Sequence, residues 1–266
     1  MSDLLAPLHP ANQLEDGLAG LWLRDRVGDD SPWRPLALSR VRSGVADGIQ
    51  WTWRRRDLES TLGWSTEILV TNWRPEAIEF DLLCVEDPSL TSPEALEANR
   101  LYPSQYLDLT PLDLGDRGTG LAIRQNMPGA RSPWALLGSH TRSIAWATDA
   151  LQLLGRGLPE GAPWPGVRQD LPSHRLQHEH AAAALQTESV RLEPGQSWLG
   201  GFFLIVVDDH PEATSPADAG IAAGVALQGG FGHPDEGVQE RPDSLVCREA
   251  AYLPTRVLTD KETLIY

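Results

Sequence analysis

The sequence has few of the features that mark several common functional classes. Cysteines are scarce: there are two, Cys84 and Cys247, far apart, and no CxxC or Cys/His spacing typical of a metal site. Basic residues are also few, since the formal net charge is −15 and the longest basic run is Arg54–Arg56. A protein that binds a polyanion needs a basic face. We therefore expect no cofactor and no nucleic-acid partner, and we interpret Arg54–Arg56 as a solvated strand end.

Long apolar runs are missing as well. A membrane-spanning helix needs about 20 consecutive apolar residues, and a secretory signal needs a basic segment followed by an apolar one. The sequence has neither pattern, so we expect a cytoplasmic protein with no membrane partner. The sequence also lacks GxSxG, GxGxxG, Walker and HExxH motifs. No residue is therefore assigned a catalytic role.

Alternation of apolar and polar residues predicts many strands. Along Ala77–Leu82, apolar and acidic residues alternate, which puts the apolar side chains on one face. Trp198–Val207 is a continuous apolar run, as expected of a strand buried on both faces. Further strands are predicted at Leu21–Arg24, Gln50–Trp53, Thr66–Trp73, Gln105–Thr110, Gly120–Gln125, Ser143–Thr148 and Ala183–Leu192. The 24 glycines and 21 prolines suit the many turns that such strands need.

Helical patterns are limited to Ser92–Glu97, with a serine cap and a proline at the first position, and to the alanine-rich Ala217–Leu227. Many strands with one or two short helices predict an all-β fold, a large antiparallel β-sandwich. We expect an irregular arm over residues 1–18, the sandwich over 19–212, and a helix and linker tail over 213–266.

The densest polar segment is Leu171–His180. We interpret it as a polar strand at the edge of the sandwich, in which His178 and His180 point to the same face. Two alternatives remain open for these histidines. They would be two ligands of a metal ion, or one of them would form an acid–base pair with a carboxylate, as sugar epimerisation requires.

Two further patterns suit carbohydrate. Arg124, Gln125 and Asn126 end a predicted strand before a turn, and their directed donors and acceptors match sugar hydroxyls as well as loop-anchoring hydrogen bonds. Ten tryptophans stand against four phenylalanines and four tyrosines, and flat indole faces match pyranose rings. Trp134 and Trp164 follow prolines in predicted loops. We favour these two, because loops carry function.

Several segments taken together resemble one protein family. In order, they are Asn99–Asp108, Arg124–Gly129, Pro133–Ser139, Ala147–Gln152 and Leu171–His180, followed by Ala184–Gln186. Their order and spacing resemble the non-catalytic region ahead of the barrel in a subgroup of glycoside hydrolase family 94. That subgroup includes 1,2-β-oligoglucan phosphorylases and the phosphorylase-like part of cyclic β-1,2-glucan synthases. The resemblance covers residues 19–212.

The resemblance implies a galactose-mutarotase-like sandwich that packs on a catalytic (α/α)₆ barrel, assists the dimer and shapes the substrate entrance. In that family the barrel carries the general acid and the phosphate site. No segment up to Tyr266 matches the barrel, so no catalytic acid is carried over. The sequence also has Asn99-Arg100 where the family pattern has an Asn-Glu pair, which puts the role of that loop in doubt.

We therefore expect a non-catalytic domain that recognises β-glucan or gluco-oligosaccharide, or that packs on a catalytic (α/α)₆ domain or on a second copy in a homodimer. The candidate ligand-binding residues are Arg124, Gln125, Asn126, Trp134, Trp164, His178 and His180. One alternative is a sugar epimerase that uses His178 or His180 with a carboxylate. The other is a partner-dependent assembly module.

Overall fold

The computed structural model describes residues 20–26, 33–36, 43–59, 61–87, 89–92, 95, 101–155, 169–177 and 180–231. The strands are β1 (Gly20–Asp25), β2 (Arg34–Pro35), β3 (Ser43–Ala46), β4 (Ile49–Asp57), β5 (Gly63–Asn72), β6 (Ile78–Glu86), β7 (Leu107–Asp113), β8 (Thr119–Gln125), β9 (Trp134–Ser139), β10 (Ser143–Asp149), β11 (Ala181–Thr187), β12 (Val190–Leu192) and β13 (Ser197–Val207). The helices are short: α2 (Leu101–Gln105), α3 (Ala150–Leu154), and the 3-10 helices η2 (Gly115–Arg117) and η4 (Pro216–Gly224).

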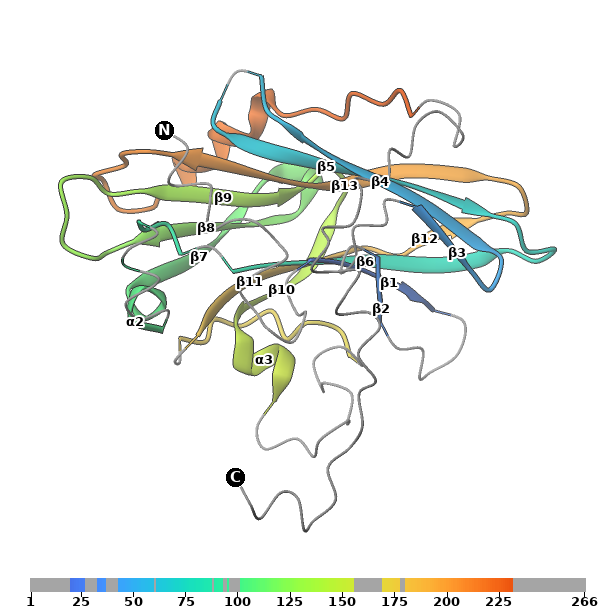
Figure 1. The fold of residues 1–266 in the computed structure, drawn as a ribbon, viewed down its shortest axis with the longest axis horizontal. Helices are drawn as coiled ribbons and strands as arrows, with labels where there is room; N and C mark the ends of the chain where they lie inside the picture. The colour runs from blue at the N-terminus through green and yellow to red at the C-terminus, as the bar shows by residue number, and fades with distance from the viewer. Residues whose placement is uncertain are drawn as a thin grey trace, which may run out of the picture. The chain divides into compact units, whose positions relative to one another are not determined.

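The strands form two sheets, which lie one over the other in Figure 1. Sheet A has six strands in the order β10-β11-β6-β1-β2, with β12 also pairing with β6. Sheet B has seven strands in the order β3-β4-β5-β13-β9-β8-β7. Every pair of neighbouring strands is antiparallel. The predicted all-β antiparallel sandwich is confirmed.

The largest apolar cluster fills the space between the sheets. It joins Ile68 and Val70 of β5 to Phe80 and Leu82 of β6, and all four side chains are at most 1% exposed. Each contributes roughly 1.5–3 kcal/mol of burial free energy. The two-residue spacing of these positions explains why alternation in the sequence marked both strands.

The outer faces of both sheets are also partly buried. On sheet A, a second cluster joins Trp22 and Val85 to Leu153 of α3 and to Leu171. On sheet B, a third cluster joins Phe203 of β13 to Ala222 and Val225, in and just after η4. The central strands are therefore covered on both faces. This agrees with the continuous apolar run that predicted β13.

After η4, residues 225–230 are tied to the outer face of sheet B by a buried carboxylate. Glu67 is fully buried and accepts hydrogen bonds from Arg54, from Arg56 and from the backbone N–H of Gln228, at 2.7 Å for the last. Burial alone raises the pKa of Glu67, but these three donors lower it below its ordinary value. The prediction of a solvated strand end at Arg54–Arg56 is wrong, because Arg54 and Arg56 form ion pairs with Glu67 in the same sheet and Arg55 forms one with Glu86 of sheet A.

The remaining differences from the prediction lie outside the regular strands. Residues 169–177 form no strand, so the predicted edge strand over this segment is wrong. Pro172 has no N–H for a ladder, and Ser173 has a positive φ of 49°. The predicted helix over 217–227 is the 3-10 helix η4, and most of the predicted helix over 92–97 lies outside the described residues. The compact unit that contains the sandwich extends to Gly230, beyond residue 212.

Candidate functional site at the α2 end

Helix α2 marks one end of the sandwich, at the left in Figure 1. The helix and the residue after it present two aromatic side chains, Tyr102 and Tyr106, which are four residues apart and thus on one face of the turn. Their rings meet edge to face at 5.1 Å, and their hydroxyl oxygens lie 3.1 Å apart. Hydrogen bonding from Tyr102 raises the pKa of Tyr106. Because Tyr102 is 48% exposed, this pair offers solvent both an aromatic surface and hydroxyl groups.

A buried amide side chain joins α2 to the end of β8. The Nε2 group of Gln125 donates to the carbonyl oxygens of Ser89, at 2.9 Å, and of Pro103, at 3.1 Å. Its Oε1 accepts from the backbone N–H of Met127, and the N–H of Asn126 donates to the carbonyl of Tyr106. Gln125 thus holds three chain segments in one arrangement, although these segments are up to 36 residues apart.

The polar segment 169–177 reaches the same end across the outer face of sheet A. Gln177 donates to the carbonyls of Gln105 and Leu107, at 3.4 and 3.2 Å, and Arg175 forms an ion pair with Asp108. These contacts place the polar segment 169–177 against the start of β7. Three of the segments that carry the family resemblance therefore meet around α2.

The start of this segment is fixed by a charged cluster. Asp81 is fully buried and accepts two hydrogen bonds from Arg24, at 3.0 and 2.5 Å, and one from Gln186, at 3.1 Å. Arg24 and Gln186 also donate to Asp170, at 2.5 and 2.8 Å. Burial by itself raises the pKa of Asp170, but the bonds from Arg24 and Gln186 lower it. All ionised groups of the cluster are paired, which is what a buried charge requires.

His180 lies directly before β11, beside Asp87, the residue that follows β6. Its Nε2 lies 3.0 Å from a carboxylate oxygen of Asp87. The hydrogen bond to Asp87 raises the pKa of His180, although burial opposes it. The next residue, Ala181, donates its N–H to Ser104 Oγ at 2.7 Å, and Ser104 belongs to α2. His180 is thus close to α2 and forms a histidine–carboxylate pair.

The α2 end as a whole carries a mixed polar and aromatic surface. Its exposed side chains are Tyr102, Gln105, Asn126, Arg175 and Gln177. They supply a phenol, amides and a guanidinium group, whose donors and acceptors have fixed directions. Such groups beside an aromatic ring suit a neutral polyhydroxyl ligand.

The candidate residues predicted from the sequence do not form one cluster. Gln125, Asn126 and His180 lie at the α2 end, and Gln125 is buried there as a loop anchor. Arg124 donates to Asn126 at 2.9 Å, but its other contact is the carbonyl of Pro211, at 2.9 Å. His178 and Trp164 lie outside the described residues.

The expectation that Trp134 is an exposed loop residue is wrong. Trp134 begins β9 and is fully buried, because the segment leading to η4 covers it. Its Nε1 donates to Thr214 Oγ1 at 3.0 Å, and the ring of His210 stacks on it at 5.2 Å. A preceding proline therefore did not indicate exposure here.

Sequence reasoning missed the two tyrosines. They lie in the motif Asn99–Asp108, of which we considered only the Asn99-Arg100 pair at the start. The four-residue spacing of Tyr102 and Tyr106 was an available signal, since it places two aromatic rings on one helical face. No pattern in the sequence indicated that these side chains would be exposed.

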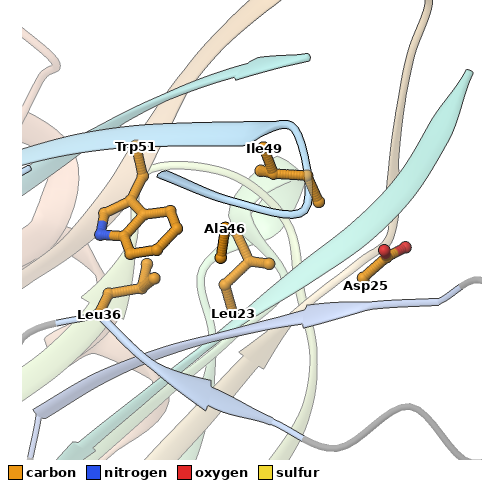
Figure 2. Close-up of a pocket in the computed structure, with 6 residues that line it drawn as sticks. All are labelled: Leu23, Asp25, Leu36, Ala46, Ile49 and Trp51. Atoms are coloured by element: carbon orange, nitrogen blue, oxygen red, sulfur yellow. The ribbon is translucent and has the colours of Figure 1, made fainter. Parts of the chain in front are cut away.

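A small cleft between β1 and the β3–β4 hairpin is a poor alternative site. It is lined by Leu23, Asp25, Leu36, Ala46, Ile49 and Trp51 (Figure 2). It has room for about one water molecule, and five of the six side chains are apolar. A sugar ring needs more space and more polar partners.

Neither a metal cluster nor a membrane helix is seen in the part of the chain that the structure describes. No three His, Cys, Asp or Glu side chains there are grouped so as to hold a metal ion. No helix in the same ranges has the length and apolar character needed to cross a bilayer.

Comparison with known proteins places the chain in a family. Residues 3–203 match the SOGP N-terminal domain. The chain belongs to this family. The 1,2-β-oligoglucan phosphorylase of Listeria innocua serovar 6a is similar to this SOGP N-terminal domain, with 29% identity over 187 residues. That match covers 66% of the chain and 17% of the phosphorylase, so the chain corresponds to a small part of that protein.

Among solved structures, a polysaccharide lyase overlaps with 72% of the chain and 26% of its own length. The TM-score is 0.44 and the sequence identity is 11%. The relation to a glucan phosphorylase rests on sequence.

Proposed function

We propose that this domain is non-catalytic and recognises β-linked gluco-oligosaccharide at the α2 end, within or beside a phosphorylase-type catalytic region. One observation carries the proposal: three motifs meet around α2, where Tyr102 and Tyr106 lie. The surface that results combines an exposed aromatic ring with exposed amide side chains. The relation to a 1,2-β-oligoglucan phosphorylase indicates the class of sugar.

Titration calorimetry with β-1,2-, β-1,3- and β-1,4-linked gluco-oligosaccharides tests the proposal. We expect linkage-selective binding that the substitution Tyr102→Ala weakens about tenfold, or about 1.4 kcal/mol. Ile144→Ala is the matched control, because Ile144 is also 48% exposed but lies near the start of β10. The other end of β10, at Asp149, pairs with Ala181, which bonds to α2. Equal affinity of the two variants for every sugar would contradict recognition at the α2 end.

Packing of the same end on an (α/α)₆ barrel, or on a second copy, is the competing outcome of that titration. No sugar binding in the isolated chain, together with Tyr102→Ala weakening association with a catalytic region added in trans, would support packing instead. Sedimentation of the wild-type chain and of the variant distinguishes self-association from both.

The pair of His180 and Asp87 favours a second candidate function, a mutarotase-like sugar epimerase. A histidine within 3.0 Å of a carboxylate oxygen provides a donor and an acceptor for proton transfer. The test is the rate of anomer interconversion of glucose and galactose, followed by NMR. Catalysis that His180→Ala abolishes would establish this function, whereas an interconversion rate equal to that of buffer would exclude it.

A further inference from the structure

One exposed tryptophan stands apart from the rest. Among the nine tryptophans in the described ranges, four are at most 6% exposed, four are half-buried, and Trp73 is 63% exposed. It follows β5 at the turn into β6, near the β3–β4 turn. These turns lie at the right of Figure 1, opposite α2. An exposed indole at this position contributes nothing to the core.

The ring of Trp73 is held in place although it is exposed. Its indole N–H donates to Gln50 Oε1 at 2.7 Å, and its backbone N–H donates to the carbonyl of Gly48 at 2.8 Å. The neighbouring Asn72 is fully buried and donates to the carbonyls of Glu76 and Leu192, at 2.9 and 3.1 Å. A ligand that stacks on this ring would lose little affinity to the ordering of the protein.

Beside Trp73 lies a row of uncharged side chains that includes two hydroxyl groups, while the charged Asp47, Arg74 and Glu76 lie at the adjoining turns. The strand register places Val45, Gln50, Thr71 and Ser197 in one row across β3, β4, β5 and β13. The hydroxyls of Thr71 and Ser197 lie 2.8 Å apart, and Val45 is 66% exposed. All four side chains in this row are uncharged. An uncharged polyhydroxyl ligand fits such a row better than an anionic or cationic one.

We propose that Trp73, Gln50, Thr71 and Ser197 form a second carbohydrate-binding site, separate from the α2 end. The indole face stacks on one pyranose ring, and the amide and hydroxyl groups bond its hydroxyls. Strand β6, which lies between the turn that holds Trp73 and the residue Asp87, has nine residues and is therefore about 30 Å long. The two sites thus lie toward opposite ends of the sandwich. The inference takes its class of sugar from the proposed function but does not need the α2 site.

The test is calorimetry and tryptophan fluorescence of the full chain with β-1,2-linked glucotriose. The wild-type chain is expected to bind two molecules, and both Trp73→Ala and Tyr102→Ala to bind one. The ligand-induced fluorescence change should fall at least fivefold in Trp73→Phe. Gln50→Leu, which removes the anchor but keeps the ring, should weaken the site about threefold.

The outcomes separate this inference from the proposed function. Loss of one site in Trp73→Ala with no change in Tyr102→Ala supports the Trp73 site and removes the α2 site. The reverse result overturns the Trp73 site. A Trp73→Ala variant that binds as the wild type but no longer self-associates would also overturn it, since Trp73 would then be a protein contact.

Discussion

The α2 end and the Trp73 end of the sandwich differ in how their surface segments are held in place. At each end, one buried amide side chain fixes the surface: Gln125 at the α2 end and Asn72 at the Trp73 end. Gln125 bonds to Ser89 and to Pro103 of α2, 36 and 22 residues away. Asn72 bonds to Glu76 and Arg74 of its own turn and to Leu192 of β12, 120 residues away. Both ends therefore include long-range bonds, but the α2 end joins a short helix and loops, whereas the Trp73 end joins the turns of paired strands.

This difference indicates which end is able to open. Segments that are joined by a few side-chain bonds form units of low local stability, while strand ladders open only with the whole domain. We expect the α2 end to adjust to a ligand and the Trp73 end to remain rigid.

The substitution with the largest expected effect is Gln125→Ala at the α2 end. It leaves two carbonyls and the N–H of Met127 without their partner. It should lower the free energy of unfolding by about 4 kcal/mol, at about 1–3 kcal/mol for each buried group. Urea denaturation measures this loss. Sugar binding at Tyr102 should weaken with it, while binding at Trp73 persists. A loss below about 1 kcal/mol would mean that the segments hold without Gln125.

The counterpart at the other end is Asn72→Ala. It should cost about 3 kcal/mol by the same measurement, since two of its three bonds are only partly buried. Here the fluorescence response of Trp73 to sugar should be lost and binding at Tyr102 retained. Loss of both sites in either variant would contradict the independence of the two ends.

Two histidines are expected to change the stability of the fold with pH in opposite directions. His140 packs on sheet B, with its Nε2 2.7 Å from Ser65 Oγ, and burial followed by the charge of Arg117 lowers its pKa to about 4. The unfolded chain binds this proton near pH 6.5, so stability should fall as pH drops from 6.5 to 4, by at most about 3 kcal/mol.

Urea denaturation of the wild type and of His140→Gln at several pH values isolates this contribution, because other groups titrate in both proteins. The difference between the two proteins should shrink or reverse toward pH 4. A difference that does not vary with pH would show that His140 keeps an ordinary pKa.

The smallest effect concerns His180. Asp87 raises its pKa above the unfolded value, so this pair stabilises the fold fully below pH 6.5 and loses that effect as pH rises through the raised value. Because the pair is partly exposed, we expect about 1 kcal/mol or less. A double-mutant cycle of His180→Ala and Asp87→Asn measures the coupling at pH 5.5 and 8.5. Equal coupling at both values would exclude a charged pair.

The sequence predicted the regular part of the fold well, for a physical reason. Strand positions follow from a period of two, which Ile78, Phe80 and Leu82 display directly. The buried run of β13 was also predicted correctly.

The binding surfaces were harder to predict, because exposure depends on what the rest of the chain covers. Trp134 begins β9 and Trp73 follows β5, yet the segment leading to η4 covers Trp134 and nothing described covers Trp73. For Gln125 the sequence left sugar binding and loop anchoring both open, since the partners that decide between them are distant along the chain. The family relation that the motifs suggested agrees with the match over residues 3–203, but the tyrosines within one motif were overlooked.

The most direct test of carbohydrate recognition at the α2 end is an NMR titration of the ¹⁵N-labelled chain with β-1,2-linked glucotriose. We predict that the largest amide shifts fall in residues 101–108, 124–127 and 174–181, and that Tyr102→Ala removes them. Shifts confined to other parts of the sandwich, or no shifts at saturating sugar, would contradict the account.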